Sequence, residues 1–258
     1  MLLCALRVGY YPTERMRIEI ITTFPGIIEA VAGESILARA RKKGILDLEA
    51  VDLREFAHDA HRTTDDEPFG GGPGMVMKCE PVFEAVETLV ARRPGSKPRI
   101  LLMTPQGRTF DQKMAEQLAA ETRVIMICGR YEGVDERIRE HLVTDEVSIG
   151  DYVLTGGEVP ALVVLDAVTR LLPGVLGDET STLSESFSSG LLDHAQYTRP
   201  AEFRSIKAPE VLLSGNHEEI RKYRRASALE RTLKRRPDLI GSARLNEEDR
   251  RILSEFRV

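Results

Sequence analysis

Two glycine-rich loops, each directly after a short strand-like run, constrain the fold of this chain most strongly. Residues 124–128 are an unbroken apolar run that ends at the loop Gly-Arg-Tyr-Glu-Gly, and residues 146–149 form a second run that leads into residues 150–158. Short apolar runs bounded by glycine are typical of buried strands. Loops that leave such strands bind ligands in open α/β sheets, although one such loop alone is more often an ordinary turn. The residues by themselves therefore indicate a ligand-binding α/β protein and no more.

The order of the other elements supports an α/β fold. The pattern of apolar residues predicts strands and helices in alternation, which favours a sheet with mainly parallel pairing. The predicted strands are residues 17–23, 45–53, 99–103, 123–128 and 146–149, with a loop at 104–107 after the third. The predicted helices are residues 27–42, 81–93, 110–121 (with Asp111 as its N-cap), 135–141 and 160–172.

Residues 54–80 show no period and are too long for an ordinary connection, which is typical of a functional or disordered loop. His58 and His61 stand near carboxylates in this stretch. Two histidines without further ligands at a regular spacing are weak evidence for a metal, so hydrogen-bonding or substrate-contact roles are favoured. The glycine run at 70–74 lacks the Gly-Lys-Ser/Thr of a phosphate-binding loop and the G-x-G-x-x-G spacing of a dinucleotide fold.

Composition indicates a cytoplasmic protein with no membrane segment. The 258 residues are 42% hydrophobic and 30% charged, and no apolar run approaches the roughly 18 residues of a membrane span. The three cysteines are odd in number and scattered, which argues against a disulfide framework and for a reducing compartment. None belongs to a C-x-x-C pair, so a structural zinc site is not expected.

Changes in character along the chain predict its domain boundaries. Residues 1–15 are interpreted as an N-terminal extension, either disordered or the result of a start assigned too early. A globular domain follows at 16–177, and residues 178–190, rich in Ser, Thr and acids, predict a flexible linker. Residues 191–258 predict a small helical domain, with helices at 217–236 and at 246–256, the latter capped by Asn246 and Asp249.

The net charge of −5 hides an asymmetry. Residues 199–258 contain 15 Lys and Arg against 10 Asp and Glu, whereas the rest of the chain contains 21 against 31. A basic segment on an acidic protein favours a docking surface for a polyanion, and a solvated helical face is the equal alternative on charge alone. The cations of the predicted helix 217–236 are Arg221, Lys222, Arg224, Arg225, Arg231, Lys234, Arg235 and Arg236.

A resemblance to a known family takes the interpretation further. GRYEGVDER at 129–137, followed by SIGDYVLTGGE at 148–158, resembles the cofactor-site signature of the bacterial tRNA (guanine-N1)-methyltransferases of the TrmD type. These are S-adenosylmethionine-dependent enzymes of the SPOUT class. Residues 61–75, 104–108, 197–200 and 212–217 resemble the same family in the same order. The likeness runs from about Met16 to the C-terminus.

The resemblance implies a SPOUT-type α/β fold, in which a mainly parallel sheet ends in a deep trefoil knot and a small all-helical domain follows. Residues 16–177 would bind S-adenosylmethionine, largely through backbone groups of the loops at 104–107, 129–133 and 149–157, and residues 191–258 would bind tRNA. The residues that match the family's cofactor site are Pro105, Gly107, Gly129, Ile149, Gly150, Asp151, Tyr152, Val153, Leu154, Gly156 and Gly157.

The implied reaction transfers a methyl group to N1 of the guanine directly 3′ of the anticodon, at position 37. N1 carries a proton at neutral pH, so the reaction requires a carboxylate base and a cation near O6. By position, Arg170 is the cation. Glu185 stands where the family usually has Asp in an Asp-Ser-Phe run, which lengthens the arm by one methylene. Asp178 and Glu179 are the alternatives for the base.

Glu132 resembles a family carboxylate associated with magnesium dependence, and a loop salt bridge with Arg130 is its alternative role. The resemblance also implies a homodimer in which both subunits build each active site. The residues expected to contact tRNA are His61, Asp65, Gly74, Arg199, Arg221 and Arg225.

Two other functions compete with this one. A SPOUT enzyme that acts on ribosomal RNA or on a ribose hydroxyl is disfavoured by the segments at 70–75, 197–200 and 212–217. A non-catalytic RNA-binding relative is supported only by the glutamate at position 185.

Overall fold

The computed structural model describes residues 15–177, 185–188 and 190–256. The chain divides into two compact units, with the boundary between Gly177 and Asp178. The N-terminal extension, apart from Arg15, lies outside the described residues. So do most of the predicted linker and the alternative bases Asp178 and Glu179.

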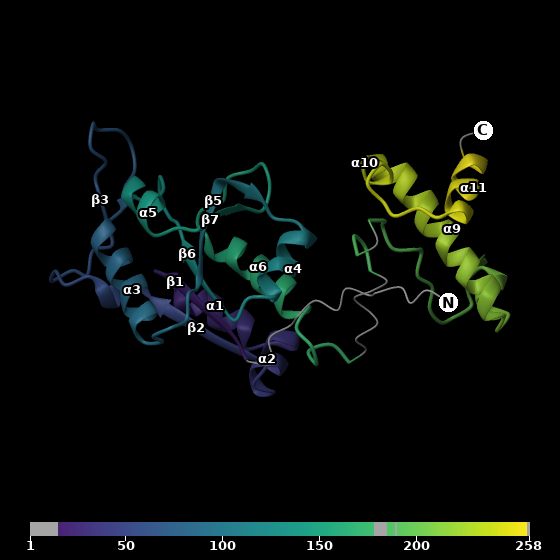
Figure 1. Cartoon of the computed structure of the whole chain (residues 1–258), viewed down its shortest axis with the longest axis horizontal. Helices are drawn as coiled ribbons and strands as arrows, with labels where there is room; N and C mark the ends of the chain where they lie inside the picture. The colour runs from purple at the N-terminus through teal and green to yellow at the C-terminus, as the bar shows by residue number, and fades with distance from the viewer. Residues whose placement is uncertain (1–14, 178–184, 189, 257–258) are drawn as a thin grey trace. The chain divides into compact units, whose positions relative to one another are not determined.

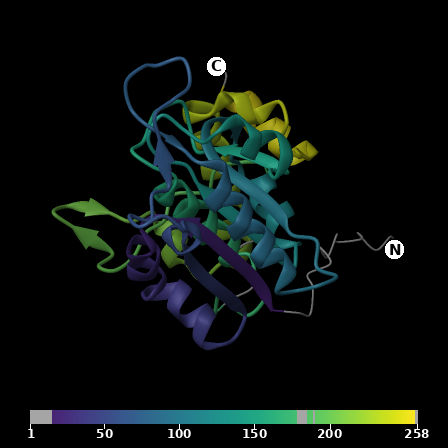
Figure 2. The ribbon, with the colours of Figure 1, turned by 90° about the vertical axis from the view of Figure 1, so that its left-hand side faces the viewer.

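A five-stranded sheet is the centre of the first unit, in the order β2-β1-β6-β5-β7. Every pairing between neighbouring strands is parallel, which confirms the predicted α/β architecture. Figures 1 and 2 show β1 and β2 side by side. The strands are β1 (Met16–Thr22), β2 (Leu46–Asp52), β5 (Arg99–Thr109), β6 (Arg123–Cys128) and β7 (Asp145–Ser148). The trefoil knot stays a prediction from the resemblance.

Helices connect the strands of the first unit. They are α1 (Pro25–Ala32), α2 (Ser35–Lys42), the 3-10 helix η1 (Leu53–Phe56), α3 (Cys79–Ala91), α4 (Gln112–Ala119), α5 (Glu136–His141) and α6 (Glu158–Thr169). The predicted single helix at 27–42 was wrong, because the chain breaks between α1 and α2, where Ser35 has a φ of 51°. The N-cap role of Asp111 is confirmed, since its side chain accepts a hydrogen bond from the Met114 amide at 2.7 Å.

The long stretch before α3 contains a small antiparallel pair, β3 (Asp65–Asp66) and β4 (Val76–Met77). Figure 1 shows the segment around β3 extending away from the sheet. The prediction of a loop at 104–107 was also incomplete, because β5 continues to Thr109. A register shift between Met103 and Arg108 interrupts its pairing with β7. The chain therefore bends outward there without leaving the sheet.

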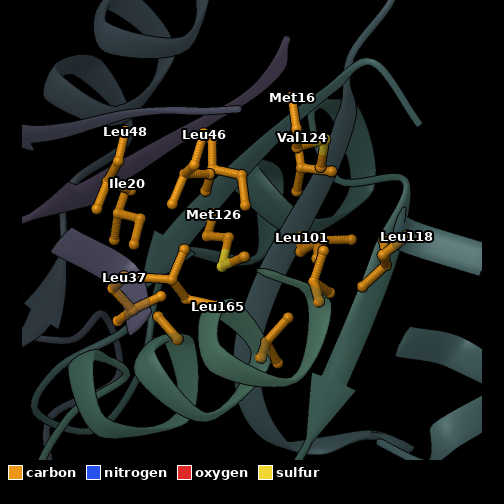
Figure 3. Packing of buried hydrophobic residues seen from close by; sticks show 14 of the residues in the cluster. Met16, Ile20, Leu37, Leu46, Leu48, Leu101, Leu118, Val124, Met126 and Leu165 are labelled. Atoms are coloured by element: carbon orange, nitrogen blue, oxygen red, sulfur yellow. The ribbon is translucent and has the colours of Figure 1, made fainter. Parts of the chain in front are cut away.

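Both faces of the sheet are buried, as expected for parallel strands. Successive residues of β6 alternate between two hydrophobic clusters: Val124, Met126 and Cys128 pack with residues of α1, α2, α4 and α6, whereas Ile125 and Ile127 pack with residues of η1, α3 and α5. Figure 3 shows Ile20, Leu46, Met126 and Leu165 within the first cluster. The unbroken apolar run of β6 follows from this double burial.

The two edges of the sheet differ in chemistry. Near the start of each of β1, β5 and β6, an arginine pairs with a carboxylate. In one of these pairs, Nε of Arg123 lies 2.8 Å from Oε2 of Glu19. Arg99 pairs with Asp145 and Arg17 with Asp47 in the same way. At the opposite edge, β6 and β7 lead into loops that contain glycine, and the pairing of β5 is interrupted at 104–107, a segment that ends in Gly107. The carboxyl ends of the strands are therefore the edge left for a ligand.

The second unit is mainly helical. Its helices are α8 (Glu210–Leu213), α9 (His217–Arg235), α10 (Pro237–Ile240) and α11 (Glu247–Glu255). Leu191, Leu229 and Leu253 form its buried core. It also contains an antiparallel hairpin of β8 (Glu202–Phe203) and β9 (Ile206–Lys207), drawn as two short arrows in Figure 2. The prediction of an all-helical unit therefore needs correction, because Arg204 and Ser205 adopt positive φ and turn the chain.

A buried ion pair ties α9 to α11. The Arg225 guanidinium donates to both carboxylate oxygens of Asp249 at 2.7 Å, and Asp249 is fully buried. Asp249 also completes the predicted capping box with Asn246. The hydrogen bonds from Arg225 hold the pKa of Asp249 below its ordinary value. Its charge therefore stabilises the unit above about pH 4, and this contribution is lost as the pH falls through the lowered pKa.

We expect Asp249→Asn to lower the free energy of unfolding of the second unit by roughly 2 kcal/mol, because it leaves the half-buried Arg225 without its counter-charge. Differential scanning calorimetry at pH 7 measures this difference. As the pH falls below about 4, the difference between wild type and variant should shrink, because the wild-type carboxylate becomes protonated.

The matched control is Asp238→Asn, which removes a carboxylate that pairs with Arg236 at the protein surface. Exposed pairs contribute about 0–1 kcal/mol, so this variant should melt close to wild type. Equal effects of the two substitutions would show that burial of the Asp249 pair does not matter.

Candidate functional site

A pocket of about 210 Å³ lies where the interrupted part of β5 at 104–107 meets the loops after β6 and β7. It brings together the three segments that the sequence analysis selected, although they are spread over some fifty residues of the chain. The residues that line it are Leu102, Met103, Thr104, Pro105, Gln106, Gly129, Arg130, Tyr131, Glu132, Gly133, Val134, Arg139, Val147, Ser148, Ile149, Gly150, Tyr152, Val153, Leu154, Thr155, Gly156, Gly157 and Pro160.

Glycine at position 157 allows two of these loops to touch. Its amide donates to the Gly129 carbonyl at 2.8 Å. A Cβ at this position would lie 2.7 Å from the Cα of Cys128 and 2.9 Å from the amide nitrogen of Gly129. Those atoms belong to the backbone at the end of β6, so they cannot move aside cheaply. The close approach therefore requires glycine.

The loop after β7 is held by its own residues. Gly150 has a φ of 147°, and a Cβ there would lie 2.6 Å from the Tyr152 ring. The Tyr152 hydroxyl donates to the Ile149 carbonyl at 3.1 Å, and the Ser148 hydroxyl donates to the Gly150 carbonyl at 3.1 Å. The loop thus presents main chain and the apolar side chains of Val153 and Leu154 to the pocket.

An ion pair between Arg130 and Glu158, which no sequence motif indicated, connects the loop after β6 to the start of α6. Arg130 lies within 2.9 Å of the Glu158 carboxylate, which is 1% exposed. The Thr22 hydroxyl, at the end of β1, donates to the same carboxylate at 2.6 Å. The Arg130 guanidinium also stacks 4.3 Å from the centre of the Phe24 ring. Glu158 is the last residue of the motif at 148–158. The sequence shows that it precedes an apolar helix, but it does not show which residues it pairs with.

This ion pair corrects the alternative role of Glu132. Arg130 pairs with Glu158, so the expected loop salt bridge between Arg130 and Glu132 does not form. Glu132 instead lies against Gly74: a Cβ added to Gly74 would be 2.4 Å from Oε1 of Glu132. The Glu132 amide donates a hydrogen bond to the Met75 carbonyl at 3.0 Å. The segment before β4 therefore lies beside the pocket.

A second contact brings β3 to the same loop. Tyr131 has a φ of 59°, which only glycine adopts without strain. Burial raises the pKa of the Tyr131 hydroxyl, and the neighbouring Asp65 carboxylate, to which it is hydrogen-bonded, adds to the effect. Two of the residues expected to contact tRNA, Asp65 and Gly74, thus lie next to the pocket-lining residues Tyr131 and Glu132.

The eleven residues predicted for the cofactor site do not all line the pocket. Nine line the pocket, whereas Gly107 and Asp151 do not. Gly107 packs against β7, because a Cβ there would lie 2.4 Å from backbone atoms of Glu146 and Val147. Close packing against β7 therefore requires glycine at position 107, and its contact with the cofactor stays a prediction. The sequence analysis missed Arg139, which lines the pocket and donates to the Gln106 side chain at 2.9 Å.

The predicted catalytic residues fall in different units. Arg170 is the C-cap of α6, the helix that begins at the pocket with Glu158. Glu185 belongs to the second unit, where its carbonyl accepts a hydrogen bond from the Ser188 hydroxyl at 2.7 Å. His61 is exposed in a turn where Asp59 accepts from the His61 amide at 2.9 Å. None of these three residues lines the pocket.

Several cations of the basic helix α9 pair with carboxylates, which makes them less available to an anionic ligand. Glu218 and Glu219 at its start pair with Arg221 and Lys222. Arg225 is tied to the buried Asp249. The Arg225 guanidinium holds α9 to α11, and its expected contact with tRNA stays a prediction.

The chemistry of the pocket fits a nucleoside better than a metal. Among the described residues, no three His, Cys, Asp or Glu side chains lie close enough to hold a metal ion. His58, one of the two histidines considered, bonds to Glu84 at 2.7 Å. Burial raises the pKa of the Cys128 thiol well above its ordinary value, so it is not a thiolate nucleophile. Main-chain donors and acceptors beside apolar side chains suit an adenine edge.

Comparisons with known proteins agree over most of the chain. The family described as tRNA (Guanine-1)-methyltransferase TrmD matches residues 16–242. A tRNA (guanine-N(1)-)-methyltransferase of Moorella thermoacetica is 56% identical over 93% of this chain and 96% of its own length. That of Bacillus subtilis is 53% identical over 93% of this chain and 99% of its own length.

A solved structure is similar as well. The crystal structure of tRNA (m1G37) methyltransferase from Aquifex aeolicus superposes with a TM-score of 0.72 at 41% identity. It covers 89% of this chain and 96% of that protein. The similarity therefore extends to both the fold and the sequence.

We expect Gly157→Ala to weaken binding of S-adenosylmethionine by roughly 10- to 100-fold. Overpacking against rigid backbone typically costs about 1–3 kcal/mol, and here the strain falls on the contact between two pocket loops. Isothermal titration calorimetry with the purified protein measures the dissociation constant.

Gly26→Ala is the matched control, because nothing lies within 4 Å of a Cβ at that position. It should bind S-adenosylmethionine like wild type. If Gly157→Ala binds as tightly as Gly26→Ala, the close contact with Cys128 and Gly129 does not shape the cofactor site.

Proposed function

Since the chain belongs to the tRNA (guanine-1)-methyltransferase TrmD family, we propose that it transfers a methyl group from S-adenosylmethionine to N1 of the guanine at position 37 of tRNA. The observation that carries this proposal is the meeting of three separate family motifs in one pocket. The broad activity, an S-adenosylmethionine-dependent tRNA (guanine-N1)-methyltransferase, follows from family membership. The position of the guanine rests on the resemblance and on the relative from Aquifex aeolicus.

The pocket residues would bind and orient the methyl donor. The bound cofactor supplies an electrophilic methyl group on a sulfonium. Pro105, Ile149 and Leu154 offer apolar surface to the adenosine part, and we assign the recognition of its adenine edge to backbone groups of the 149–157 loop, as the resemblance implies. Gly129, Gly156 and Gly157 let that main chain come close. The network of Arg130, Glu158 and Thr22 keeps these loops in position during the reaction.

The remaining groups act on the guanine. A base must take the proton from N1, since the protonated nitrogen has no lone pair in position to attack the methyl carbon. A cation near O6 stabilises the negative charge that develops as the proton leaves. We assign the base to Glu185 and the cation to Arg170 from their positions in the family pattern. To Glu132, which lies against Gly74, we assign the interaction with a magnesium ion that the resemblance implies.

Replacement of Glu185 tests the base directly. We expect Glu185→Gln to reduce the rate of methyl transfer by about 100-fold or more, because the amide cannot accept the proton. Glu185→Asp, which restores the usual family residue, should keep activity within roughly tenfold of wild type. The measurement is single-turnover transfer of tritiated methyl to a tRNA transcript with guanines at positions 36 and 37.

Glu255→Gln, a change at an exposed glutamate of α11, is the matched control and should leave the rate unchanged. Full activity of Glu185→Gln would remove Glu185 from the mechanism and point to Asp178, Glu179 or a water. Absence of methyl transfer by wild type, with tRNA still bound, would favour the non-catalytic RNA-binding relative.

We also propose that the chain acts as a homodimer, in which each active site combines the pocket of one copy with Glu185 of the other, as the resemblance implies. Support comes from an exposed apolar surface on α1 and α6, two helices that contact each other. Its residues are Phe24, Ile27, Val31, Val159 and Val163, each about 40–55% exposed. Exposed apolar side chains on two neighbouring helices favour an interface with a partner.

We expect Val163→Lys to shift the protein toward monomer, because it places a charge in this apolar surface. Sedimentation velocity at micromolar concentration reports the change. The control is Val90→Lys, a similarly exposed valine on α3, which should leave the dimer intact. A monomeric wild type, or a dimer that tolerates Val163→Lys, would contradict the proposed interface.

The cellular location stays a proposal. Among the described residues, no helix is both long and apolar enough to cross a membrane. We propose a cytoplasmic location, where the tRNA substrate is found.

A further inference from the structure

The second unit contains a cavity that the methyl-transfer reaction does not use. Its volume is about 330 Å³, and it lies between the segment before β8 and the helices α8 and α9. The residues that line it are His194, Ala195, Gln196, Tyr197, Thr198, Arg199, Ala201, Ala208, Leu212, Leu213 and Arg224. A volume of this size is at the lower end of the range for small-molecule sites, roughly 300–1,000 Å³.

The charge of this cavity is positive and is not compensated within it. Arg199 and Arg224 both line it, and none of the lining residues is Asp or Glu. Neither guanidinium has a carboxylate partner among the residues that the structure describes, in contrast to the paired Arg221, Lys222 and Arg225. Arg231 and Arg235 of α9 also have no carboxylate partner there, but they do not line the cavity. Two guanidiniums on one cavity without a carboxylate favour an anionic ligand.

The histidine of the cavity is oriented toward the same kind of ligand. His194 Nδ1 lies 2.6 Å from the Asp193 carboxylate, which also accepts from the Gln196 amide at 3.0 Å. With Nδ1 engaged, Nε2 is the ring nitrogen left for a ligand. Asp193 does not line the cavity, and among the described residues it forms no ion pair with Arg199 or Arg224.

The other lining residues are apolar or aromatic. Leu212, Leu213 and two alanines offer apolar surface, and the Tyr197 ring is half-exposed. Tyr197 lies near Tyr223 of α9, and burial together with this neighbouring phenol raises the pKa of Tyr223. An aromatic ring beside arginines is a common arrangement for a nucleotide, whose base stacks while its phosphate pairs.

From this combination we propose that the cavity binds one nucleotide of the RNA substrate, with its phosphate at Arg199 and Arg224 and its base or ribose against Tyr197 and Leu213. The proposal rests on the proposed function, because it takes tRNA as the ligand. It differs from general attraction of RNA to the basic helix, since it assigns one nucleotide to one cavity and excludes the paired cations of α9.

Two variants test the two halves of the ligand. Arg224→Gln should weaken tRNA binding by roughly tenfold and should reduce the slope of log affinity against log salt by about one, because one phosphate contact is lost. Tyr197→Leu should weaken binding without changing that slope, because stacking does not release counterions. Filter binding at several salt concentrations measures both quantities with the full-length protein.

Arg251→Gln is the matched control, an exposed arginine of α11 in the same unit that does not line the cavity. It should change affinity and slope much less than Arg224→Gln. Arg224→Lys keeps the charge but loses the planar fork, so its affinity should fall between wild type and Arg224→Gln. Thermal melting checks that each variant is folded.

The outcomes separate this proposal from the proposed function. Equal effects of Arg224→Gln and Arg251→Gln, or an unchanged salt slope in Arg224→Gln, would overturn the nucleotide site. Wild-type protein that binds tRNA with these variant effects but transfers no methyl group would sink the proposed reaction and leave the cavity assignment standing. In methyl-transfer assays, Arg224→Gln should raise the KM for tRNA and leave kcat within about twofold of wild type, since Arg224 touches no reacting atom.

Discussion

A single buried carboxylate, Glu158, holds the pocket together. It receives Arg130 from the loop after β6 and the Thr22 hydroxyl from the end of β1, and it begins the helix α6. A buried charge is costly unless it is paired and hydrogen-bonded, so the three segments are stable only in this arrangement. Gly156 is part of the same constraint, because a Cβ there would lie 2.4 Å from Arg130 and 2.5 Å from Glu158. The shape of the cofactor site thus depends on one ion pair beneath it.

The two ends of the strands differ: ion pairs between strands lie where the strands begin, and the pocket lies where they end. The strands begin among arginine–carboxylate pairs, such as Arg123 with Glu19, which fix neighbouring strands to one another. They end in loops whose glycines permit contacts that larger residues would block. The pocket can therefore combine rigid support with closely spaced main chain. An arrangement of this kind suits a cofactor that is read mostly through backbone groups.

Positive charge in the second unit has two uses that a count of residues does not distinguish. Arg225 holds α9 to α11 through the buried Asp249, and Arg221 is occupied by Glu218. Arg199 and Arg224 have no such partners among the described residues, and both face the same cavity. The number of guanidiniums left for an anionic ligand therefore depends on which of them are paired, and not on the number of basic residues.

The sequence by itself determined the strands, the glycine loops and the family, because these are local: apolar runs such as residues 124–128 and the motif after them can be recognised from neighbouring residues. Nine of the eleven residues that it predicted for the cofactor site line the pocket, and it missed the break between α1 and α2 and the packing of Gly107 on β7. Only the tertiary structure decided that Glu158 pairs with Arg130 and Thr22, that Asp249 takes Arg225, and that Arg224 shares a cavity with Arg199. The physical reason is separation along the chain. Thr22 and Glu158 are 136 residues apart, and no local pattern of hydrophobicity or charge records which distant group will neutralise a buried one.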